Sequence, residues 1–368
     1  MTETCLAAVI TRFGEPTELR EVPLPDVEPG GVLVRVDAAT LCGTDVHLWS
    51  GKSWIGEETL PYIPGHETAG TVVSVGGDVT DIVNVSLQPG DRVIATYPYC
   101  GHCYFCTVAN TRNLCVTGVR YGRERADRPP YLLGGAAEYH YFPSGSEIVR
   151  IPDEVTAPLA ASAACAVRTV MFGFERLGTI LSHETVVVQG AGPIGLYAAA
   201  AARAAGARKV YVIGAPAERL EVARAFGVDD VLNLEEVADA ADRVTWVRDR
   251  TNGLGADVVV QGAGSLAIPE GLEMARRGGR YLSIGNTDGD LVVPARNLSV
   301  KQLTIIGVVM AEGRHFYQAL QFLATQQGRF PFHRMITGVY DLAGTGAALQ
   351  AMADLKEIKP VILPNAGR

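Results

Sequence analysis

Three cysteines lie two residues apart in the segment CGHCYFC, and a fourth cysteine follows after eight residues. They are Cys100, Cys103, Cys106 and Cys115. Four thiolates at such spacing can complete a tetrahedral zinc site, which leaves no position for water and is therefore structural. The alternative is a turn with buried cysteines, but a loop that also contains Gly and Tyr gives no packing reason for so many thiols. The spacing therefore predicts a structural zinc.

A second set of metal-ligating residue types is dispersed along the chain. Cys42 lies in LCGTDVH, His66 in PGHE and Cys165 in AACAVRT. One histidine and two cysteines would leave an open position on a zinc ion, which is the arrangement of a catalytic site. Single Cys and His residues more often belong to a core or a surface. Spacing alone therefore leaves both interpretations open.

A glycine motif stands between an apolar run and an Ala-rich segment. Its spacing is G-x-G-x-x-G, and the apolar run covers residues 186–189. The pattern predicts a strand, a tight turn and a helix, whose free N–H groups and dipole would bind a pyrophosphate. A turn that only packs a helix onto a sheet is the alternative, and the flanking segments favour the dinucleotide site. The turn residues are Gly190, Gly192, Pro193, Ile194 and Gly195.

The elements that must position these residues fall into a β-rich part, up to about residue 155, and an alternating part. Strands are expected at 8–11, 32–38, 71–75 and 92–95 in the first part. In the second part, strands at 186–189, 209–213, 230–232, 257–260 and 280–284 alternate with helices at 193–205, 216–226 and 266–277. Later in the chain we expect a strand at 303–308 and helices at 315–327 and 343–354. The alternation predicts a parallel sheet with helices on both faces, and a site in the cleft between two domains.

Composition limits the classes of function. The chain has 368 residues, enough for two domains, and its net charge of −8 argues against nucleic acid as a partner. No apolar run reaches membrane-spanning length, and the N-terminal segment lacks the basic start of a signal peptide. An odd number of cysteines, seven, indicates reduced thiols and metal ligands rather than disulfides. We therefore expect a cytoplasmic protein.

The segments CGTDVH, GHETAG, CGHCYFC, CAVRT and GAGPIG, in this order, resemble the zinc-dependent medium-chain dehydrogenase/reductase family of alcohol, polyol and threonine dehydrogenases. The resemblance covers nearly the whole chain. It implies an α/β fold, in which a Rossmann doubly wound parallel sheet is inserted in a β-rich GroES-like catalytic domain. The implied boundaries are 1–157 for the catalytic domain with a zinc lobe at about 97–116, 158–300 for the dinucleotide domain, and 301–368 for the segment that completes the catalytic domain.

The resemblance also implies roles for the residues around the first zinc motif. Cys42, His66 and Cys165 match the ligands of a catalytic zinc, and the four clustered cysteines match a structural zinc. Glu67 matches a carboxylate that approaches or transiently binds the catalytic metal. Asp45 matches the group that orients the ligand histidine. Thr44 matches the hydroxyl that receives the substrate proton in a proton relay, and His47 matches the end of that relay at the surface.

Four further residues match the cofactor site of the family. Thr169 matches a residue packed against the nicotinamide, and Lys359 stands where many members have a basic contact to the pyrophosphate. Gly214 occupies the position at which NAD-specific members carry Asp or Glu, so a 2′-phosphate meets no repulsion there. Arg219 could contact that phosphate. The resemblance therefore implies NAD or NADP, with a preference for NADP.

Two more positions depart from the usual family pattern. The gap before the fourth structural cysteine is normally seven residues and is eight here, so a bulge is expected while ligation survives. Cys165 stands where many polyol dehydrogenases have Glu, which favours the alcohol dehydrogenase type. The segment 116–135 carries four arginines; it either shapes the entrance and recognises an acidic group or is a solvated loop.

The implied function is hydride transfer between an alcohol, bulky or secondary, or its carbonyl, and NAD(P), with two zinc ions per chain. A homodimer or homotetramer is expected, in which the apolar segment LTIIGVVM could pair between subunits. The alternatives are a zinc-independent quinone or enoyl reductase and a non-catalytic cofactor-binding paralogue. Either would lack a ligand or relay residue, and none is missing from the sequence.

Overall fold

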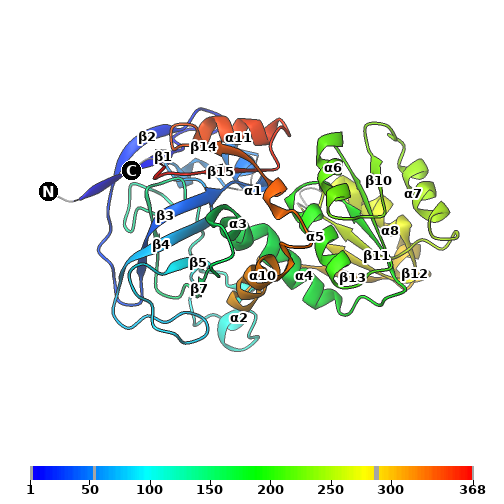
Figure 1. Cartoon of the computed structure of the whole chain (residues 1–368), viewed down its shortest axis with the longest axis horizontal. Coiled ribbons are helices and arrows are strands. Elements are labelled where there is room, and N and C mark those ends of the chain that lie inside the picture. Colours follow the sequence, from blue (N-terminus) through cyan, green and yellow to red (C-terminus); the bar gives the residue numbers. More distant parts are fainter. Residues whose placement is uncertain (1–2, 53–54, 286–289, 367–368) are drawn as a thin grey trace. The chain divides into compact units, whose positions relative to one another are not determined.

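The computed structural model describes residues 3–52, 55–285 and 290–366 of the chain (Figure 1). The chain divides into two compact units. The first comprises Met1–Arg168, Met310–Thr325 and Met335–Arg368, and the second comprises Thr169–Val309 and Gln326–Arg334. The first unit is therefore built from three separate segments, and each unit is described by itself below.

A mostly antiparallel sheet of seven strands forms the centre of the first unit, and a separate hairpin of two strands accompanies it. The order in the large sheet is β14-β15-β3-β4-β5-β7, and β6 also pairs with β3. In this sheet β14 and β15 run parallel to each other. The strands of the large sheet are β3 (Val32–Thr40), β4 (Glu67–Val75), β5 (Arg92–Ala95), β6 (Tyr139–Phe142), β7 (Ile148–Arg150), β14 (Ile336–Tyr340) and β15 (Lys359–Ile362); the hairpin consists of β1 (Thr4–Val9) and β2 (Glu18–Pro23).

The register of this sheet brings three chain segments to one place. The last residue of β3, Thr40, lies opposite the first residue of β4, Glu67. Thr40 also lies opposite Val361 of β15, and the N–H of Leu41 donates to the carbonyl of Pro360. β15 starts at Lys359. Residues near 40, 67 and 359 are therefore neighbours because of backbone pairing alone.

Short helices connect the strands of the first unit. The helices are α1 (Gly43–Trp49), α2 (Tyr104–Thr107), α3 (Ala157–Ser162), α10 (Gly313–Gln326) and α11 (Thr345–Ala353). Single 3-10 turns occur at Glu57–Thr59 and Arg112–Leu114, and a π-helical turn occurs at Ala163–Val167; a further 3-10 turn, Phe332–Met335, begins in the second unit and ends at the first residue of the last segment of the first unit. The π-helical turn follows α3 directly; such turns are rare and frequently mark functional sites.

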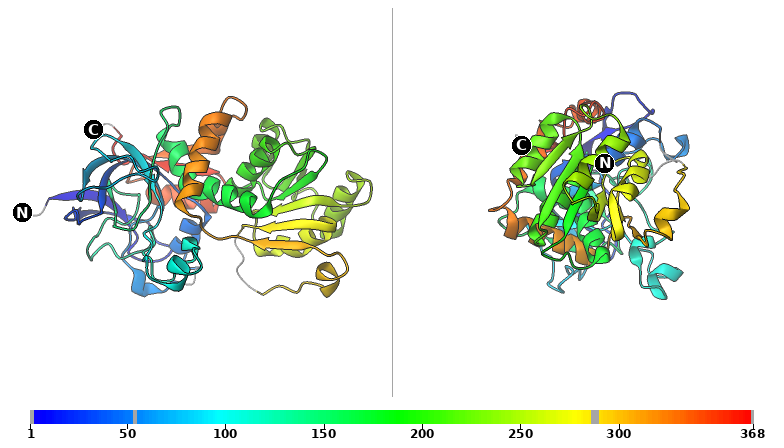
Figure 2. Two further views of the ribbon diagram at one scale, coloured as in Figure 1. Left: turned by 90° about the horizontal axis from the view of Figure 1, so that it is seen from below. Right: turned by 90° about the vertical axis from the view of Figure 1, so that its right-hand side faces the viewer.

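The second unit contains a parallel sheet of six strands in the order β10-β9-β8-β11-β12-β13 (Figure 2). Counted along the chain, this is the order 3-2-1-4-5-6 of a doubly wound fold, which reverses beside β8. The strands are β8 (Thr185–Gln189), β9 (Lys209–Gly214), β10 (Asp230–Asn233), β11 (Ala256–Gln261), β12 (Ala275–Ser283) and β13 (Thr304–Gly307). The helices are α4 (Arg168–Leu177), α5 (Pro193–Ala204), α6 (Ala217–Ala225), α7 (Ala240–Asp249), α8 (Ile268–Met274) and α9 (Ala295–Leu298), with a 3-10 turn at Ser265–Ala267. Val186, Val187 and Val188 are fully buried, as expected for a strand covered on both faces.

The fold class predicted from the sequence is confirmed, and most predicted elements exist. Elements that the sequence analysis did not identify are the hairpin strand β2, strands β6, β7, β14 and β15, and helices α1, α2, α3, α4, α7 and α9. The run Ala157–Leu177 also differs from expectation, because by length and composition it could cross a membrane. However, 72% of its most apolar window is buried inside the structure, as in the core helix of a globular protein.

Candidate active site and metal centres

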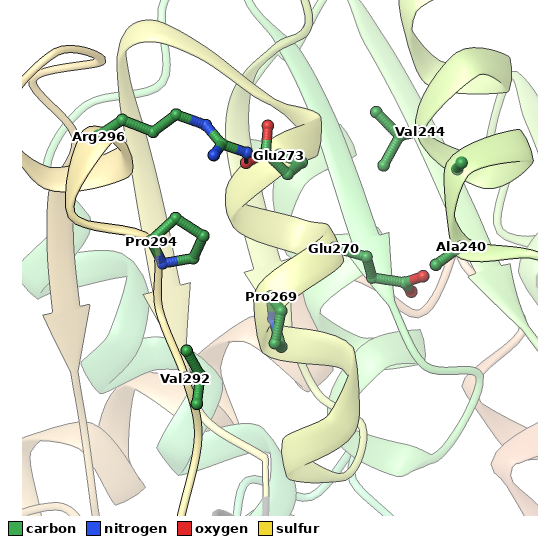
Figure 3. Close-up of a pocket in the computed structure, with 9 residues that line it drawn as sticks. Ala240, Val244, Pro269, Glu270, Glu273, Val292, Pro294 and Arg296 are labelled. Carbon is green, nitrogen blue, oxygen red and sulfur yellow. Dashed lines mark hydrogen bonds and ion pairs between the residues drawn. The ribbon is translucent and has the colours of Figure 1, made fainter.

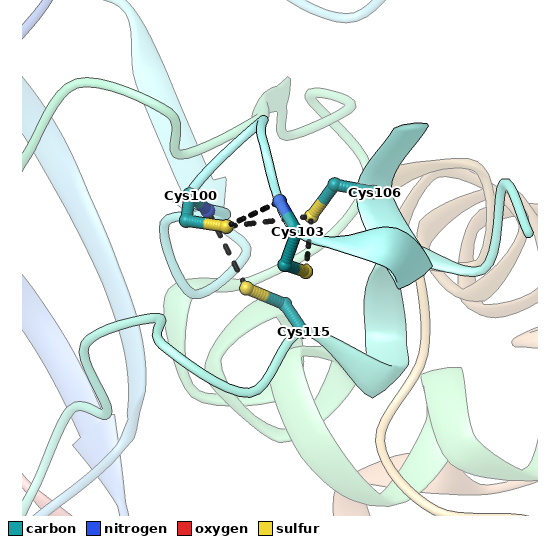
Figure 4. Close-up of side chains that lie close together, drawn as sticks. All are labelled: Cys100, Cys103, Cys106 and Cys115. Atoms are coloured by element: carbon teal, nitrogen blue, oxygen red, sulfur yellow. Dashed lines mark hydrogen bonds between the residues drawn. The ribbon is translucent and has the colours of Figure 1, made fainter. Parts of the chain in front are cut away.

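The four clustered cysteines converge on one point (Figure 4). Their sulfurs all lie within 4.8 Å of one another. The Sγ atoms of Cys103 and Cys106 are 3.5 Å apart, and those of Cys100 and Cys106 are 3.9 Å apart. Two sulfurs on one tetrahedral zinc ion stand about 3.8 Å apart. The donor set and its spacing therefore fit a structural zinc.

The chain accommodates the extra residue before Cys115 locally. Asn110 takes a positive φ of 49°, and a 3-10 turn at Arg112–Leu114 then leads into the cysteine. Backbone N–H groups donate to two of the sulfurs, from Cys100 to Cys115 and from Cys103 to Cys100. These contacts favour thiolates, so the longer gap is compatible with four converging ligands.

A second cluster is formed by Cys42, His66, Glu67 and Cys165, whose ligand atoms also lie within 4.8 Å of one another. Cys42 caps the N-terminus of α1, His66 and Glu67 lie at the start of β4, and Cys165 lies in the π-helical turn. The Cys42 Sγ and His66 Nε2 atoms are 3.4 Å apart. That distance is close to the roughly 3.5 Å between sulfur and nitrogen ligands of one tetrahedral zinc.

Asp45 is the hub of the contacts behind this cluster. Its Oδ1 lies 3.1 Å from His66 Nδ1 and accepts from the N–H of Gly65. Its Oδ2 accepts from the N–H of Cys42 at 2.9 Å. Asp45 has an exposed fraction of 1%. One carboxylate therefore fixes both Cys42 and His66, and it leaves His66 Nε2 facing the other ligand atoms.

Electrostatics prepare these side chains to bind a cation. A hydrogen bond from Cys165 and the charge of His66 hold the pKa of the Cys42 thiol well below its usual range, despite burial. Burial opposes protonation of His66, but Asp45 raises the pKa of the imidazole well above its usual value. Thiolates and a neutral imidazole are donors that zinc prefers, so binding of the cation would release the protons that these side chains carry.

The predicted relay residues lie on α1. Thr44 follows the capping Cys42 and is exposed, and its N–H donates to the Cys42 sulfur. His47 is half-buried and lies three residues further along, so both side chains are on one face of the helix. Their assignment to a relay stays a prediction.

Lys359, for which a contact with a pyrophosphate is predicted, is the first residue of strand β15. Its side chain is fully buried and forms an ion pair with Glu67, which is also fully buried. Its Nζ also donates to the carbonyl of Leu41 at 3.4 Å. Sequence reasoning missed this pair, although a lysine in the otherwise apolar strand KPVI was a sign that a buried acid must lie near.

The arginine-bearing segment 116–135 contacts the second cluster through its backbone. A Cβ atom on Gly122 would lie 3.2 Å from the backbone nitrogen of His66, and Gly122 has a positive φ of 78°. Arg120 donates to the carbonyl of Cys115 and lies over the ring of Tyr97. This segment is therefore packed against His66 rather than being a detached loop.

In the second unit, the glycine motif forms the predicted turn between β8 and α5. Gly190 has a φ of 106°, and a Cβ on Gly195 would come within 1.9 Å of the Gly190 carbonyl oxygen. Gly192 is the N-cap of α5, and a Cβ there would meet nothing within 4 Å. Packing therefore explains Gly195, whereas the open space at Gly192 fits a pyrophosphate at the helix N-terminus.

The remaining predicted cofactor residues lie in the same unit. A Cβ on Gly214 would come within 2.7 Å of Ala191, so close packing on the glycine turn requires a glycine at the end of β9. Arg219 is mostly buried in the first turn of α6, and burial lowers its pKa. Thr169 is buried near the start of α4.

One hollow in the second unit is unrelated to these residues (Figure 3). It has a volume of about 310 Å³ and lies beside α7 and α8. Its lining includes Val244, Pro269, Glu270 and Val292, and none of its lining residues belongs to the predicted site. We assign it no role in the chemistry.

Comparison with known families identifies two domains in the chain. Residues 28–153 match the model of the alcohol dehydrogenase GroES-like domain, and residues 193–325 match that of the zinc-binding dehydrogenase. The chain is 35% identical over 350 residues to 5-exo-hydroxycamphor dehydrogenase from Pseudomonas putida, with 94% of this chain and 95% of that protein covered. The chain belongs to the zinc-dependent medium-chain dehydrogenase family. As a member of that family it is an oxidoreductase that acts on alcohols with NAD(P).

Other members of the zinc-dependent medium-chain dehydrogenase family are similar over the same length. L-threonine 3-dehydrogenase from Pyrococcus horikoshii is 33% identical, with 92% of each chain covered. The crystal structure of an alcohol dehydrogenase from Thermotoga maritima superposes with a TM-score of 0.91 at 30% identity, covering 99% of this chain and all of that one. A zinc-binding dehydrogenase from Sinorhizobium meliloti, solved with NADP bound, has a TM-score of 0.84 at 26% identity, covering 98% of this chain and 100% of that one.

Proposed function

We propose that this dehydrogenase oxidises a bulky secondary alcohol, or reduces the matching ketone, at a zinc held by Cys42, His66 and Cys165. The observation that carries the proposal is the convergence of these three side chains with Asp45 behind His66. The names of the relatives support the substrate class, since hydroxycamphor is a bulky secondary alcohol and the 3-hydroxyl of threonine is also secondary.

A metal bound here would supply a Lewis acid that makes the substrate hydroxyl more acidic, and a bound nicotinamide would supply the hydride acceptor. The protein's own residues hold the donors and move the proton. Asp45 keeps His66 in the tautomer that presents Nε2. Thr44, exposed at the start of α1, takes the hydroxyl proton, and His47 passes it toward solvent.

For the cofactor we propose NADP rather than NAD. Gly214 offers no carboxylate to the ribose, and its contact with Ala191 means that a larger residue does not fit there. Arg219, five residues further along, is the candidate partner of a 2′-phosphate. The Sinorhizobium meliloti structure shows that a similar protein binds NADP.

We further propose a second, structural zinc at the four-cysteine cluster, and a homodimer or homotetramer in the cytoplasm. β13 lies at the edge of the six-stranded sheet, and Ile305 in that strand is 44% exposed. An unpaired apolar edge can extend into the sheet of a second copy.

The test is to count zinc in the purified protein and to follow nicotinamide absorbance with NAD⁺ and NADP⁺ over primary, secondary, cyclic and polyol alcohols. We expect two zinc ions per chain and turnover of bulky secondary alcohols with NADP⁺. Cys42→Ser should abolish turnover and leave cofactor binding intact. Full turnover by Cys42→Ser, or by protein that holds only one zinc, would contradict the proposal.

A further inference from the structure

The pair formed by Lys359 and Glu67 is buried inside the candidate catalytic cluster. Both side chains are fully buried, and the lysine Nζ contacts both carboxylate oxygens. Thr40 donates a third hydrogen bond, to Oε2. The carboxylate is therefore held by two donor residues, one from strand β15 and one from strand β3.

Glu67 is near enough to the ligands to compete for their metal. Its Oε1 lies 4.0 Å from His66 Nε2, and its oxygen belongs to the same cluster as both sulfurs. Nitrogen and oxygen ligands on one tetrahedral zinc stand about 3.3 Å apart. The carboxylate is thus just outside a ligand position, and a small shift toward His66 would make it a fourth ligand.

From this arrangement, and resting on the proposed catalytic zinc, we propose that Lys359 is a positioning residue that keeps Glu67 from becoming a permanent zinc ligand. An unpaired carboxylate is strongly unfavourable when buried. With Lys359 removed, the metal would be the cation within reach of Glu67. A fourth protein ligand would close the position that a catalytic zinc keeps open for substrate.

A positioning role and a merely structural role of Lys359 predict opposite changes in the rate of zinc loss. Replacement of Lys359 by Met removes the charge and keeps the length of the side chain. We expect the catalytic zinc to be lost to a chelator about tenfold more slowly, while kcat falls about tenfold or more. If Lys359 only supported the fold, its loss would loosen the site and speed the loss of zinc.

The experiment compares Lys359→Met, Glu67→Gln and the double variant in the full-length protein. Zinc per chain is followed during dialysis against a chelator, and the structural zinc serves as an internal reference. The double variant should release zinc at about the wild-type rate, because a neutral amide in place of the carboxylate is a poor zinc ligand. Lys356→Met is the control, since Lys356 is exposed and near in sequence.

Cobalt replacement of the catalytic zinc gives a readout that does not depend on turnover. The visible absorption of Co²⁺ should change in Lys359→Met and return to the wild-type form in the double variant. Lys359→Gln keeps a hydrogen-bond donor beside Glu67 and gives the same comparison if Lys359→Met does not fold.

Zinc loss from Lys359→Met at the wild-type rate or faster, or absence of rescue by Glu67→Gln, would overturn the inference. Failure of the proposed function looks different, because the wild-type protein would then hold a single zinc or show no dehydrogenase activity before any variant is compared.

Discussion

Asp45 and His66 are joined through Oδ1 and Nδ1 at 3.1 Å, and the same carboxylate also holds the backbone of Cys42. This contact ties the cap of α1 to the start of β4. Cys42 and His66, two proposed zinc ligands from different elements, are thereby both held by Asp45. The contacts of Asp45 explain how Cys42 and His66 can be held rigidly although one caps helix α1 and the other precedes strand β4.

Asp45→Asn should weaken the catalytic centre while leaving the ligands in place. An amide still accepts a hydrogen bond from Cys42, but it no longer supplies the charge that orients and polarises His66. We expect about a 10- to 100-fold loss of zinc affinity and activity. Competition with a zinc-binding dye measures the affinity. Wild-type affinity in the variant would show that Asp45 does not support the metal.

Cys115→Ser should remove the structural zinc. Cys115 is 3% exposed and packs beside the other three cysteines, so the lobe loses its shared centre. Elemental analysis should find one zinc ion fewer per chain, and thermal melting should occur at lower temperature. The matched control is Cys5→Ser, because Cys5 is similarly buried but belongs to neither cluster. Equal zinc content in both variants would refute the assignment.

Gly192→Ala and Gly195→Ala should have different effects although both change the same turn. A Cβ at position 195 collides with the Gly190 carbonyl, so this variant should lose stability. A Cβ at position 192 meets open space, so this variant should fold normally and bind NADP more weakly. Thermal melting and cofactor titration separate the two effects. Unchanged cofactor affinity in a stable Gly192→Ala variant would argue against a pyrophosphate there.

His140 should make the protein less stable as the pH falls. Its side chain is fully buried against Thr68, and burial lowers the pKa of His140 to about 3. The unfolded value is about 6.5, so below that pH the unfolded chain binds a proton that the folded chain does not. The stability that His140 contributes is present above this pH and should fall by about 2 kcal/mol between pH 7 and pH 5.

The comparison for this effect is His140→Phe, which fits among Tyr121 and Phe142 without a titrating group. Denaturant unfolding at both pH values gives the two free energies of unfolding for each protein. The wild type should lose stability relative to the variant as the pH falls. Parallel pH dependence in the two proteins would show that His140 titrates normally.

Ile305→Lys should weaken association between copies of the chain if β13 pairs with its equivalent. A charge on an edge strand opposes strand pairing. Size-exclusion chromatography with light scattering would report a smaller species with an intact fold. Leu254→Lys is the matched control, because Leu254 is more exposed and lies outside the strands. An unchanged mass for Ile305→Lys would place the contact elsewhere.

The sequence predicted the parts of this structure whose signal is local. The β8–α5 turn follows from three glycines and a valine run, and the four-cysteine lobe follows from its spacing. Strand β15 carried no such signal, because four residues with a lysine at the start do not resemble a core strand. Its place is set by pairing with β3, which lies more than 300 residues earlier. For the same reason the pairing of Lys359 with Glu67 was not predicted.

The catalytic cluster also had only a weak signal in sequence. Cys42, His66 and Cys165 are separated widely, and a single Cys or His has many uses. Their convergence depends on a strand start, a helix cap and a π-helical turn meeting at one point. Local sequence patterns do not predict contacts between these three elements. The assignment of Cys42, His66 and Cys165 as zinc ligands therefore rested on the resemblance to a family.

The separation between Glu67 and Lys359, 292 residues, has a consequence for the synthesis of the protein. At ordinary rates of translation, about 15 to 60 s pass between the synthesis of the two residues. Once Cys165 has also been synthesised, the nascent chain carries both thiols, the imidazole and the acid, but not yet the lysine that pairs with the acid. A metal ion that binds before Lys359 is synthesised would therefore find Glu67 available as a ligand, unlike a metal ion that binds to the finished protein. The order of synthesis therefore makes the counter-charge the last part of the centre to arrive.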